Sequence, residues 1–174
     1  SDLASLSTKA ELDGDEWVIN GQKIWTSGAQ DADMMFCLVR TEPDAPKHNG
    51  ISYLIFTMDT PGIDVRPLVT MMGEAIFNEV FFTDVRVPAE NILLGPGRGF
   101  EIAQGRLGPG RIHHCMRLIG LAQRALEAAC RRVEQRTTFG RKLSEHQSVS
   151  EDLARCFCEI EQARLLTLKA ADQM

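Results

Sequence analysis

The distribution of proline divides this sequence into two parts. All seven prolines lie between positions 43 and 109, and the last 65 residues contain no proline and only three glycines, Gly110, Gly120 and Gly140. Proline and glycine are the strongest interrupters of regular structure, so their near absence marks a change of architecture. We therefore expect an N-terminal part of short elements with many turns, followed by a part built from longer elements.

The N-terminal part contains short apolar runs of strand length. They cover residues 5–11, 17–20, 34–40, 51–58, 63–69 and 79–87. Asp13-Gly14 and Asn20-Gly21 lie between such runs, and these pairs are typical of two-residue hairpin turns, which need positive φ. The pattern predicts an antiparallel β-barrel or sandwich.

The C-terminal part changes to helical periodicity. After Gly110, apolar residues recur every three or four positions from Ile112 to Val133, and a second series runs from about His146 to the end of the sequence. The short connection at 138–140 predicts two long antiparallel helices. Two helices cannot enclose a bundle core, so we expect partner helices from outside this chain or from another subunit.

Charge is distributed as unevenly as proline. The net charge is −5, which argues mildly against nucleic-acid binding by the whole chain, but residues 105–142 carry nine basic and two acidic side chains. An arginine-rich stretch beside glycine suits phosphate groups through bidentate hydrogen bonds. Most of these arginines are expected on a solvated helix face, and Arg111 and Arg136, at expected helix ends, are the candidates for binding.

The other composition signals exclude several classes of site. Five cysteines without a CxxC pair predict a reducing compartment and buried structural thiols, and no zinc or other metal site. His113 and His114 are adjacent on the expected helix and cannot easily chelate one ion, so we expect capping or packing roles. The sequence has no apolar run long enough to cross a membrane and no signal-peptide core.

Two segments are candidates for ligand binding. Trp25, Thr26 and Ser27 combine a flat aromatic side chain with two hydroxyls, which could form a wall for a planar ligand, although a strand tryptophan such as Trp25 or Trp17 is more often core. The glycine-rich segments 95–100 and 105–111 are expected to be turns first. Gly108, Pro109, Gly110 and Arg111 could also form an anion site at a helix N-terminus.

These residues together resemble the acyl-CoA dehydrogenases, over essentially the whole chain. The matching stretches are Ser1-Asp2, residues 15–25, Thr60-Pro61-Gly62, residues 79–88, residues 136–140 and His146-Gln147, in that order. Residues 97–114 look most like the branch of the family that is sometimes fused to a kinase-like domain. The resemblance implies an α+β chain: a middle β-domain over 1–98 and the first two helices of a four-helix C-terminal domain over 99–174.

The resemblance also implies an FAD site. Trp25, Thr26 and Ser27 would face the flavin, with the Ser27 hydroxyl near its N5 atom, where relatives often have threonine. Arg136, Thr137, Thr138, Phe139, His146 and Gln147 would reach the adenosine and pyrophosphate of FAD in a neighbouring subunit of a homo-oligomer, a dimer of dimers.

The implied reaction converts an acyl-CoA to a trans-2-enoyl-CoA. Ser1 and Gly108, Pro109, Gly110 and Arg111 would lie along the substrate, although relatives often have Asp in place of Gly108. The catalytic glutamate of some relatives corresponds to Gly110, so no catalytic base is expected in this chain, and a glutamate beyond Met174 is expected instead. The connection at 73–79 is shorter than is usual in the family.

Three activities remain open at this stage. The first is a dehydrogenase that passes electrons to an electron-transferring flavoprotein. The second is an oxygen-using acyl-CoA oxidase or flavin monooxygenase of the same fold, and the third is a non-enzymatic FAD-binding relative. The implied location is the cytoplasm in a bacterium, or the mitochondrial matrix or peroxisome in a eukaryote.

Overall fold

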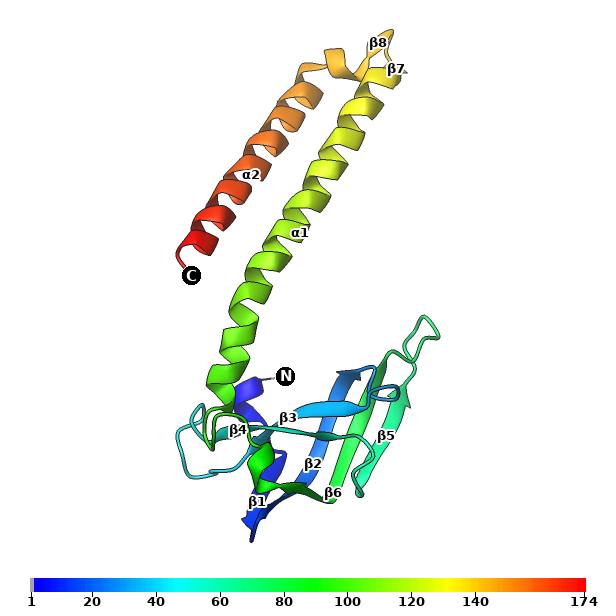
Figure 1. Ribbon diagram of the computed structural model, residues 1–174. Helices are drawn as coiled ribbons and strands as arrows, with labels where there is room; N and C mark the ends of the chain where they lie inside the picture. The colour runs from blue at the N-terminus through cyan, green and yellow to red at the C-terminus, as the bar shows by residue number, and fades with distance from the viewer. Residues whose placement is uncertain (1) are drawn as a thin grey trace. The chain divides into compact units, whose positions relative to one another are not determined.

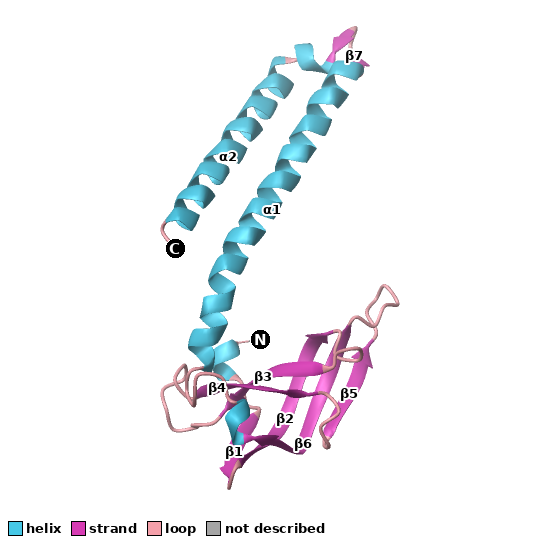
Figure 2. Ribbon diagram, viewed as in Figure 1, coloured by secondary structure: helices cyan, strands magenta, loops and turns pink. Residues whose placement is uncertain are grey.

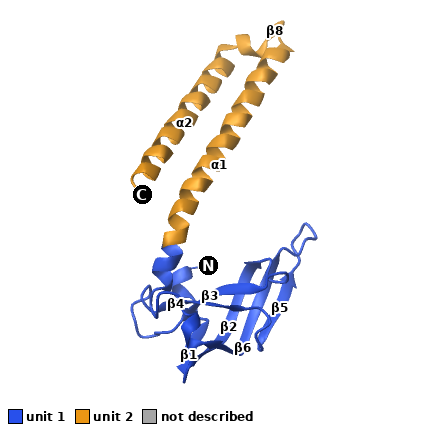
Figure 3. Cartoon of the chain, in the orientation of Figure 1, with its two compact units in different colours: residues 1–104 blue, residues 105–174 orange. Residues whose placement is uncertain are grey.

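The computed structural model describes residues 2–174 and contains two compact units. The first unit ends at Gln104, and the second covers Gly105–Met174 (Figures 1 and 3). The chain is mixed α+β, with a six-stranded sheet in the first unit and two long helices, as the sequence predicted. The domain boundary between residues 98 and 99 stays a prediction.

The first unit is built on one six-stranded sheet. In spatial order the strands are β4 (Ile51–Thr57), β3 (Met34–Arg40), β1 (Lys9–Asp13), β2 (Glu16–Ser27), β6 (Phe77–Pro88) and β5 (Ile63–Leu68), with short 3₁₀ helices η1 (Leu3–Ser5) and η2 (Ala89–Asn91). All neighbours are antiparallel except β1 and β3, which meet as a parallel pair at Lys9 and Arg40. The predicted strands are therefore confirmed, with shifted ends.

The core of this unit lies between two parts of the same sheet. In Figure 2, strands β3 and β4 cross over β2 and β6. Side chains from all four strands form one buried cluster, in which Ile19, Leu54, Val80 and Val85 are completely buried. A single folded sheet thus encloses its own apolar face, and the burial of these side chains stabilises the unit.

The two predicted hairpin turns have different outcomes. Asp13-Gly14 is confirmed, because Asp13 pairs with Glu16 and Gly14 has a φ of 66°. Asn20-Gly21 is not a turn: both residues lie inside the twelve-residue strand β2. The Asn20 side chain bonds to both the backbone N–H and the carboxylate of Asp84, which has a φ of 49°. Asn20 therefore fixes an irregularity in the pairing of β2 with β6 instead of starting a hairpin.

Strands β2 and β6 contain two register shifts that compensate each other. Between the pairs Ile19–Val85 and Gly21–Phe82, β6 has one extra residue. Between the pairs Lys23–Val80 and Thr26–Asn78, β2 has one extra residue. Each shift is a β-bulge, which bends a strand and redirects its side chains without ending the ladder.

The helical elements begin before the end of the first unit. Helix α1 (Gly99–Gln135) is followed by β7 (Thr137–Thr138), β8 (Arg141–Lys142), η3 (Leu143–Glu145) and α2 (Gln147–Asp172). In the first unit, the Phe100 ring packs against His48 with centroids 4.3 Å apart, and the backbone of Gly99 lies against Ser52. These contacts start α1 well before the apolar series that begins at Ile112.

The glycine-rich segment 105–111 is therefore not a turn, contrary to expectation. It lies within α1, where Pro109 lacks the N–H that would bond to the carbonyl of Gly105. Helix-forming residues lie on both sides of the segment. The other predicted turn, 95–100, is confirmed only at residues 95–97, because α1 begins at Gly99.

The second unit exposes many apolar side chains. Ile119 and Ile160 are buried, whereas Leu118, Leu121, Leu165 and Leu166 are each more than 60% exposed.

Among residues 2–174, no helix combines the length and apolar character that a membrane crossing requires.

We predict that Gly21→Ala destabilises the protein by about 2–4 kcal/mol. Gly21 has a φ of 137°, and an added Cβ would lie 2.8 Å from the backbone Cα of Thr8 on the neighbouring chain segment. Urea unfolding measures the loss. Gly14→Ala is the control, because Gly14 also has positive φ but open space around it, so it should lose only about 1 kcal/mol. Equal losses in both variants would contradict the close approach of Thr8.

Candidate functional site

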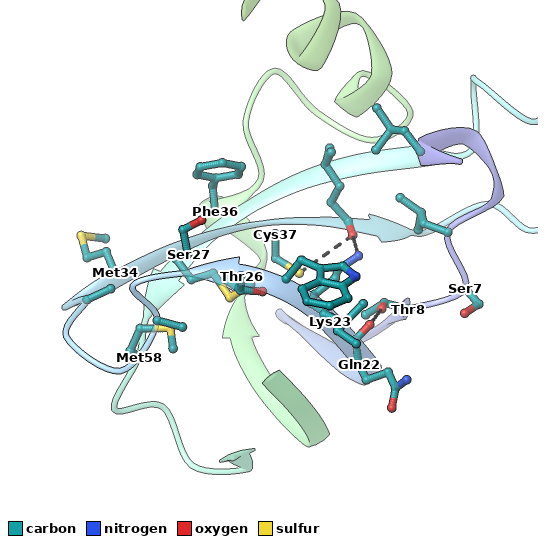
Figure 4. A pocket seen from close by; sticks show the side chains of 18 of the residues that line it. Ser7, Thr8, Gln22, Lys23, Thr26, Ser27, Met34, Phe36, Cys37 and Met58 are labelled. Carbon is teal, nitrogen blue, oxygen red and sulfur yellow. Dashed lines mark hydrogen bonds between the residues drawn. The ribbon is translucent and has the colours of Figure 1, made fainter. Parts of the chain in front are cut away.

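A cavity of about 780 Å³ opens beside the second bulge of the first unit. Its walls come from η1, the segment that follows it, and strands β2 and β3 (Figure 4). Its lining mixes apolar side chains with hydroxyls, and includes Ser7, Thr8, Lys23, Trp25, Thr26, Ser27, Met34, Phe36, Cys37 and Met58. This mixture suits a large planar ligand with a polar edge.

Trp25 is the most unusual residue of this cavity. It lies at the bulge of β2 with a φ of 62°, and its side chain is 60% exposed. Phe77 supports its ring edge-on, with centroids 5.9 Å apart. Positive φ is unfavourable for a bulky residue and occurs mostly where function requires it. Trp17, by contrast, is a core residue, which confirms the ordinary interpretation for that tryptophan.

The end of β2 is held in place by a buried amide. Asn78 on β6 is completely buried, and its Nδ2 donates to the backbone carbonyl of Thr26 at 3.0 Å and to the side chain of Gln30. The N–H of Gly28 also donates to the carbonyl of Ile76 at 3.1 Å. Thr26 and the exposed Ser27 therefore have a fixed backbone, which places both at the cavity.

Two cavity residues that the sequence analysis did not identify meet at one carbonyl. The Lys23 ammonium donates to the carbonyl oxygen of Leu38 at 2.6 Å, and the Cys37 thiol approaches the same oxygen at 3.9 Å (Figure 4). Burial lowers the pKa of Lys23 and raises the pKa of Cys37 to about 11, so that the thiol is neutral. No local pattern in the sequence marks this pair, because Leu38 lies on a different strand from Lys23.

The remaining titratable group of the lining is Asp2. Its carboxylate accepts from the Lys47 ammonium at 2.8 Å, from the Ser5 hydroxyl and from the backbone N–H of Ala4. These hydrogen bonds, that from Lys47 foremost, hold the pKa of Asp2 far below its usual value. Asp2 is therefore an ionised, paired carboxylate and a weak base.

A second cluster of predicted residues forms in the second unit. Phe139 and Gly140 make the two-residue turn between β7 and β8, both with positive φ, and Phe139 is almost fully exposed. His146 lies within 3.5 Å of the Thr138 hydroxyl and 3.2 Å of the Arg141 guanidinium. The carbonyl of Arg136 accepts from the N–H of Leu143 at 2.8 Å.

The cluster thus brings six predicted residues into one structural feature. Arg136, Thr137, Thr138, Phe139, His146 and Gln147 all lie in the hairpin that joins α1 to α2 or at its two ends. Gln147 is the first residue of α2, where its amide donates to Glu151 at 2.6 Å. The structure describes this cluster and the cavity in separate units.

The predicted anion site at a helix N-terminus is wrong. Gly108, Pro109, Gly110 and Arg111 lie in the interior of α1, so the backbone N–H groups there are not those of a free helix end. An added Cβ at Gly108 would lie 2.9 Å from the Met174 side chain, and Gly110 has open space. Ser1 lies outside the described residues. Within residues 2–174, no group of His, Cys, Asp and Glu could hold a metal ion.

Comparison with known proteins identifies the family. The chain is 53% identical to acyl-CoA dehydrogenase family member 10 of Mus musculus, over all of this chain and 17% of that protein. It also matches acyl-CoA dehydrogenase from Geobacillus kaustophilus, with 35% identity and a TM-score of 0.84, over 99% of this chain and 46% of that one. It matches butyryl-CoA dehydrogenase from Megasphaera elsdenii with 35% identity and a TM-score of 0.82, over 98% of this chain and 45% of that one.

The chain thus spans less than half the length of each of these proteins. Its two parts correspond to two described domains. Residues 1–85 match the acyl-CoA dehydrogenase middle domain, and residues 97–174 match the acyl-CoA dehydrogenase C-terminal domain. Together with the fold, these matches show that the chain belongs to the acyl-CoA dehydrogenase family.

Proposed function

We propose that this chain takes part in the FAD-dependent α,β-dehydrogenation of an acyl-CoA thioester to a trans-2-enoyl-CoA. The observation that carries the proposal is the strained, exposed Trp25 beside Ser27 on a cavity of about 780 Å³. The names of the solved relatives, butyryl-CoA dehydrogenase among them, support the substrate class. An electron-transferring flavoprotein is the proposed electron acceptor.

The cavity fits a flavin in shape and in chemistry. The exposed indole of Trp25 offers a flat surface for an isoalloxazine ring, and the Ser27 hydroxyl offers a hydrogen bond to its N5 edge. Met34, Phe36 and Met58 offer apolar surface for the rest of the ring system. Bound FAD would supply the hydride acceptor, and the residues of this chain would hold and orient it.

The hairpin cluster is proposed to bind the other end of FAD. Arg136 would pair with the pyrophosphate, and the exposed Phe139 and the His146 ring would contact the adenosine. In a homo-oligomer of paired dimers this FAD belongs to the neighbouring subunit. Exposure of the Phe139 ring on a strained turn supports a partner that covers it.

The base that removes the substrate α-proton is proposed to lie beyond Met174. Gly110 has no side chain, and Asp2, which carries the one carboxylate of the described cavity lining, has too low a pKa to take a proton efficiently. Arg111, on α1, is proposed to contact the acyl-CoA with the neighbouring residues Gly108, Pro109 and Gly110. Its guanidinium suits the phosphates of coenzyme A.

We predict that an acyl-CoA bleaches the oxidised flavin of the holoprotein in the absence of oxygen. The experiment follows flavin absorbance with a panel of straight and branched acyl-CoA substrates. Free coenzyme A is the negative control, and dithionite shows that the bound flavin is reducible. Bound FAD that no acyl-CoA reduces would refute the enzyme proposal. Rapid reoxidation of the reduced flavin by air would favour an oxidase.

Arg136→Ala is expected to weaken FAD binding by about tenfold, because it removes a charge-assisted hydrogen bond. The association of subunits should weaken with it, since the proposed FAD lies between them. FAD released on dialysis and mass by light scattering measure both effects. Arg155→Ala is the matched control, because Arg155 is an exposed arginine of α2 that pairs with Asp152. Full flavin occupancy in Arg136→Ala would overturn the assignment.

A further inference from the structure

Lys23 places a partly buried positive charge in the wall of the cavity. Its ammonium lies between β2 and β3 and donates to the carbonyl of Leu38 at 2.6 Å. Within the part of the chain that the structure describes, no carboxylate lies within 4.0 Å of this ammonium. Burial of a cation without a counter-charge is unfavourable, and one carbonyl offsets only part of that cost.

The other titratable groups of the cavity do not neutralise this charge. Asp2 is paired with Lys47, and its hydrogen bonds also involve Ser5 and the N–H of Ala4. Cys37, which faces Lys23 from β3, is a neutral thiol because burial raises its pKa. Because Asp2 is paired with Lys47, Lys23 is the charge of the described lining that has no counter-charge, which suits an electron-rich or anionic group in the cavity.

Lys23 also belongs to the same short segment as the proposed flavin contacts. It precedes the bulge of β2, Trp25 forms the bulge, and Ser27 ends the strand, and all three line one cavity. The bond to Leu38 fixes the ammonium at the wall instead of leaving it mobile in solvent. A charge held at a fixed place with little water acts more strongly on a ligand than a solvated one.

We propose that Lys23 raises the reduction potential of the flavin bound in this cavity. This inference rests on the proposed function. Two electrons and one proton added to the flavin leave it with one more negative charge, and a fixed ammonium stabilises that charge. In the proposed reaction the electrons come from the acyl-CoA as hydride, and the α-proton goes to the carboxylate base. Lys23 forms no bond to the substrate, so it is a tuning residue.

The test measures the midpoint potential of the holoprotein by titration with dithionite and a reference dye. Lys23→Gln keeps a donor for Leu38 without the charge, and Lys23→Met removes both. Each of these two variants should shift the equilibrium between oxidised and reduced flavin about tenfold toward the oxidised form. For a two-electron couple this lowers the midpoint potential by about 30 mV. Lys23→Arg should retain the wild-type potential, because the charge remains.

Lys9→Met is the matched control. Lys9 is a half-exposed lysine of the same sheet that pairs with Glu11 and does not line the cavity, so its loss should leave the potential unchanged. Wild-type potentials in Lys23→Gln and Lys23→Met would show that Lys23 is purely structural and overturn the inference. Dithionite needs no acyl-CoA, so a potential shift without reduction by any acyl-CoA would keep the inference and refute the dehydrogenase.

A measurement on the wild-type holoprotein covers the case in which these variants fail to fold. By linkage, reduction of the flavin must raise the pKa of Lys23 if Lys23 favours the reduced form. Between the pKa of Lys23 in the oxidised protein, which burial lowers, and its higher pKa in the reduced protein, the potential should fall by about 60 mV per pH unit instead of about 30. Cys37→Ala should keep the steeper range. A potential that falls by only about 30 mV per pH unit throughout the range in which Lys23 loses its proton would overturn the inference.

Discussion

The pairing of β2 with β6 is the constraint on which the core and the cavity both depend. The first half of β2 contributes Trp17 and Ile19 to the core, whereas its second half contributes Lys23, Trp25 and Ser27 to the cavity. The first extra residue lies in β6 and the second in β2, between Lys23 and Thr26, so the two bulges offset each other. The register after them equals the register before them, and Ser27 pairs with Phe77 as Glu16 does with Pro88.

The residues that hold these bulges have clear physical roles. At the first, the Asn20 amide bonds to both the backbone and the side chain of Asp84. After the second, the buried Asn78 amide holds the carbonyl of Thr26. The strain at Trp25 is therefore supported by hydrogen bonds on both sides of the bulge. This support keeps an exposed aromatic ring in a conformation that the isolated segment would rarely adopt.

The sequence predicted which strands and helices form better than it predicted their turns and their first residues. Alternation and periodicity located the strands and the second helix because these patterns report burial directly. Asn20-Gly21 was misassigned to a hairpin turn because a residue pair that tolerates positive φ occurs in β-bulges as well as in turns. Residues 105–111 were misassigned because α1 begins earlier, where Gly99 lies against Ser52 and Phe100 against His48, and both partners are distant in the sequence.

Some residues of the candidate site could be identified from the sequence, and others only from the structure. Trp25, Thr26 and Ser27 were identifiable by residue type and by family resemblance, and the structure places all three on one cavity. Lys23 and Asn78 were not, because their roles depend on Leu38 and on Thr26 across strand pairs. A lysine or an asparagine in a strand gives no local signal of such a partner. The fold of the site, and not its composition, therefore reveals the partly buried charge.

Time-resolved flavin fluorescence of the holoprotein tests directly whether the bulge of β2 forms the wall of the flavin site. An indole in contact with a flavin quenches its emission, so we expect strong quenching in the wild type that is relieved in Trp25→Phe. Trp17→Phe is the control, because Trp17 is buried in the core of the same unit. Quenching that persists in Trp25→Phe would show that the bulge of β2 does not form the flavin wall.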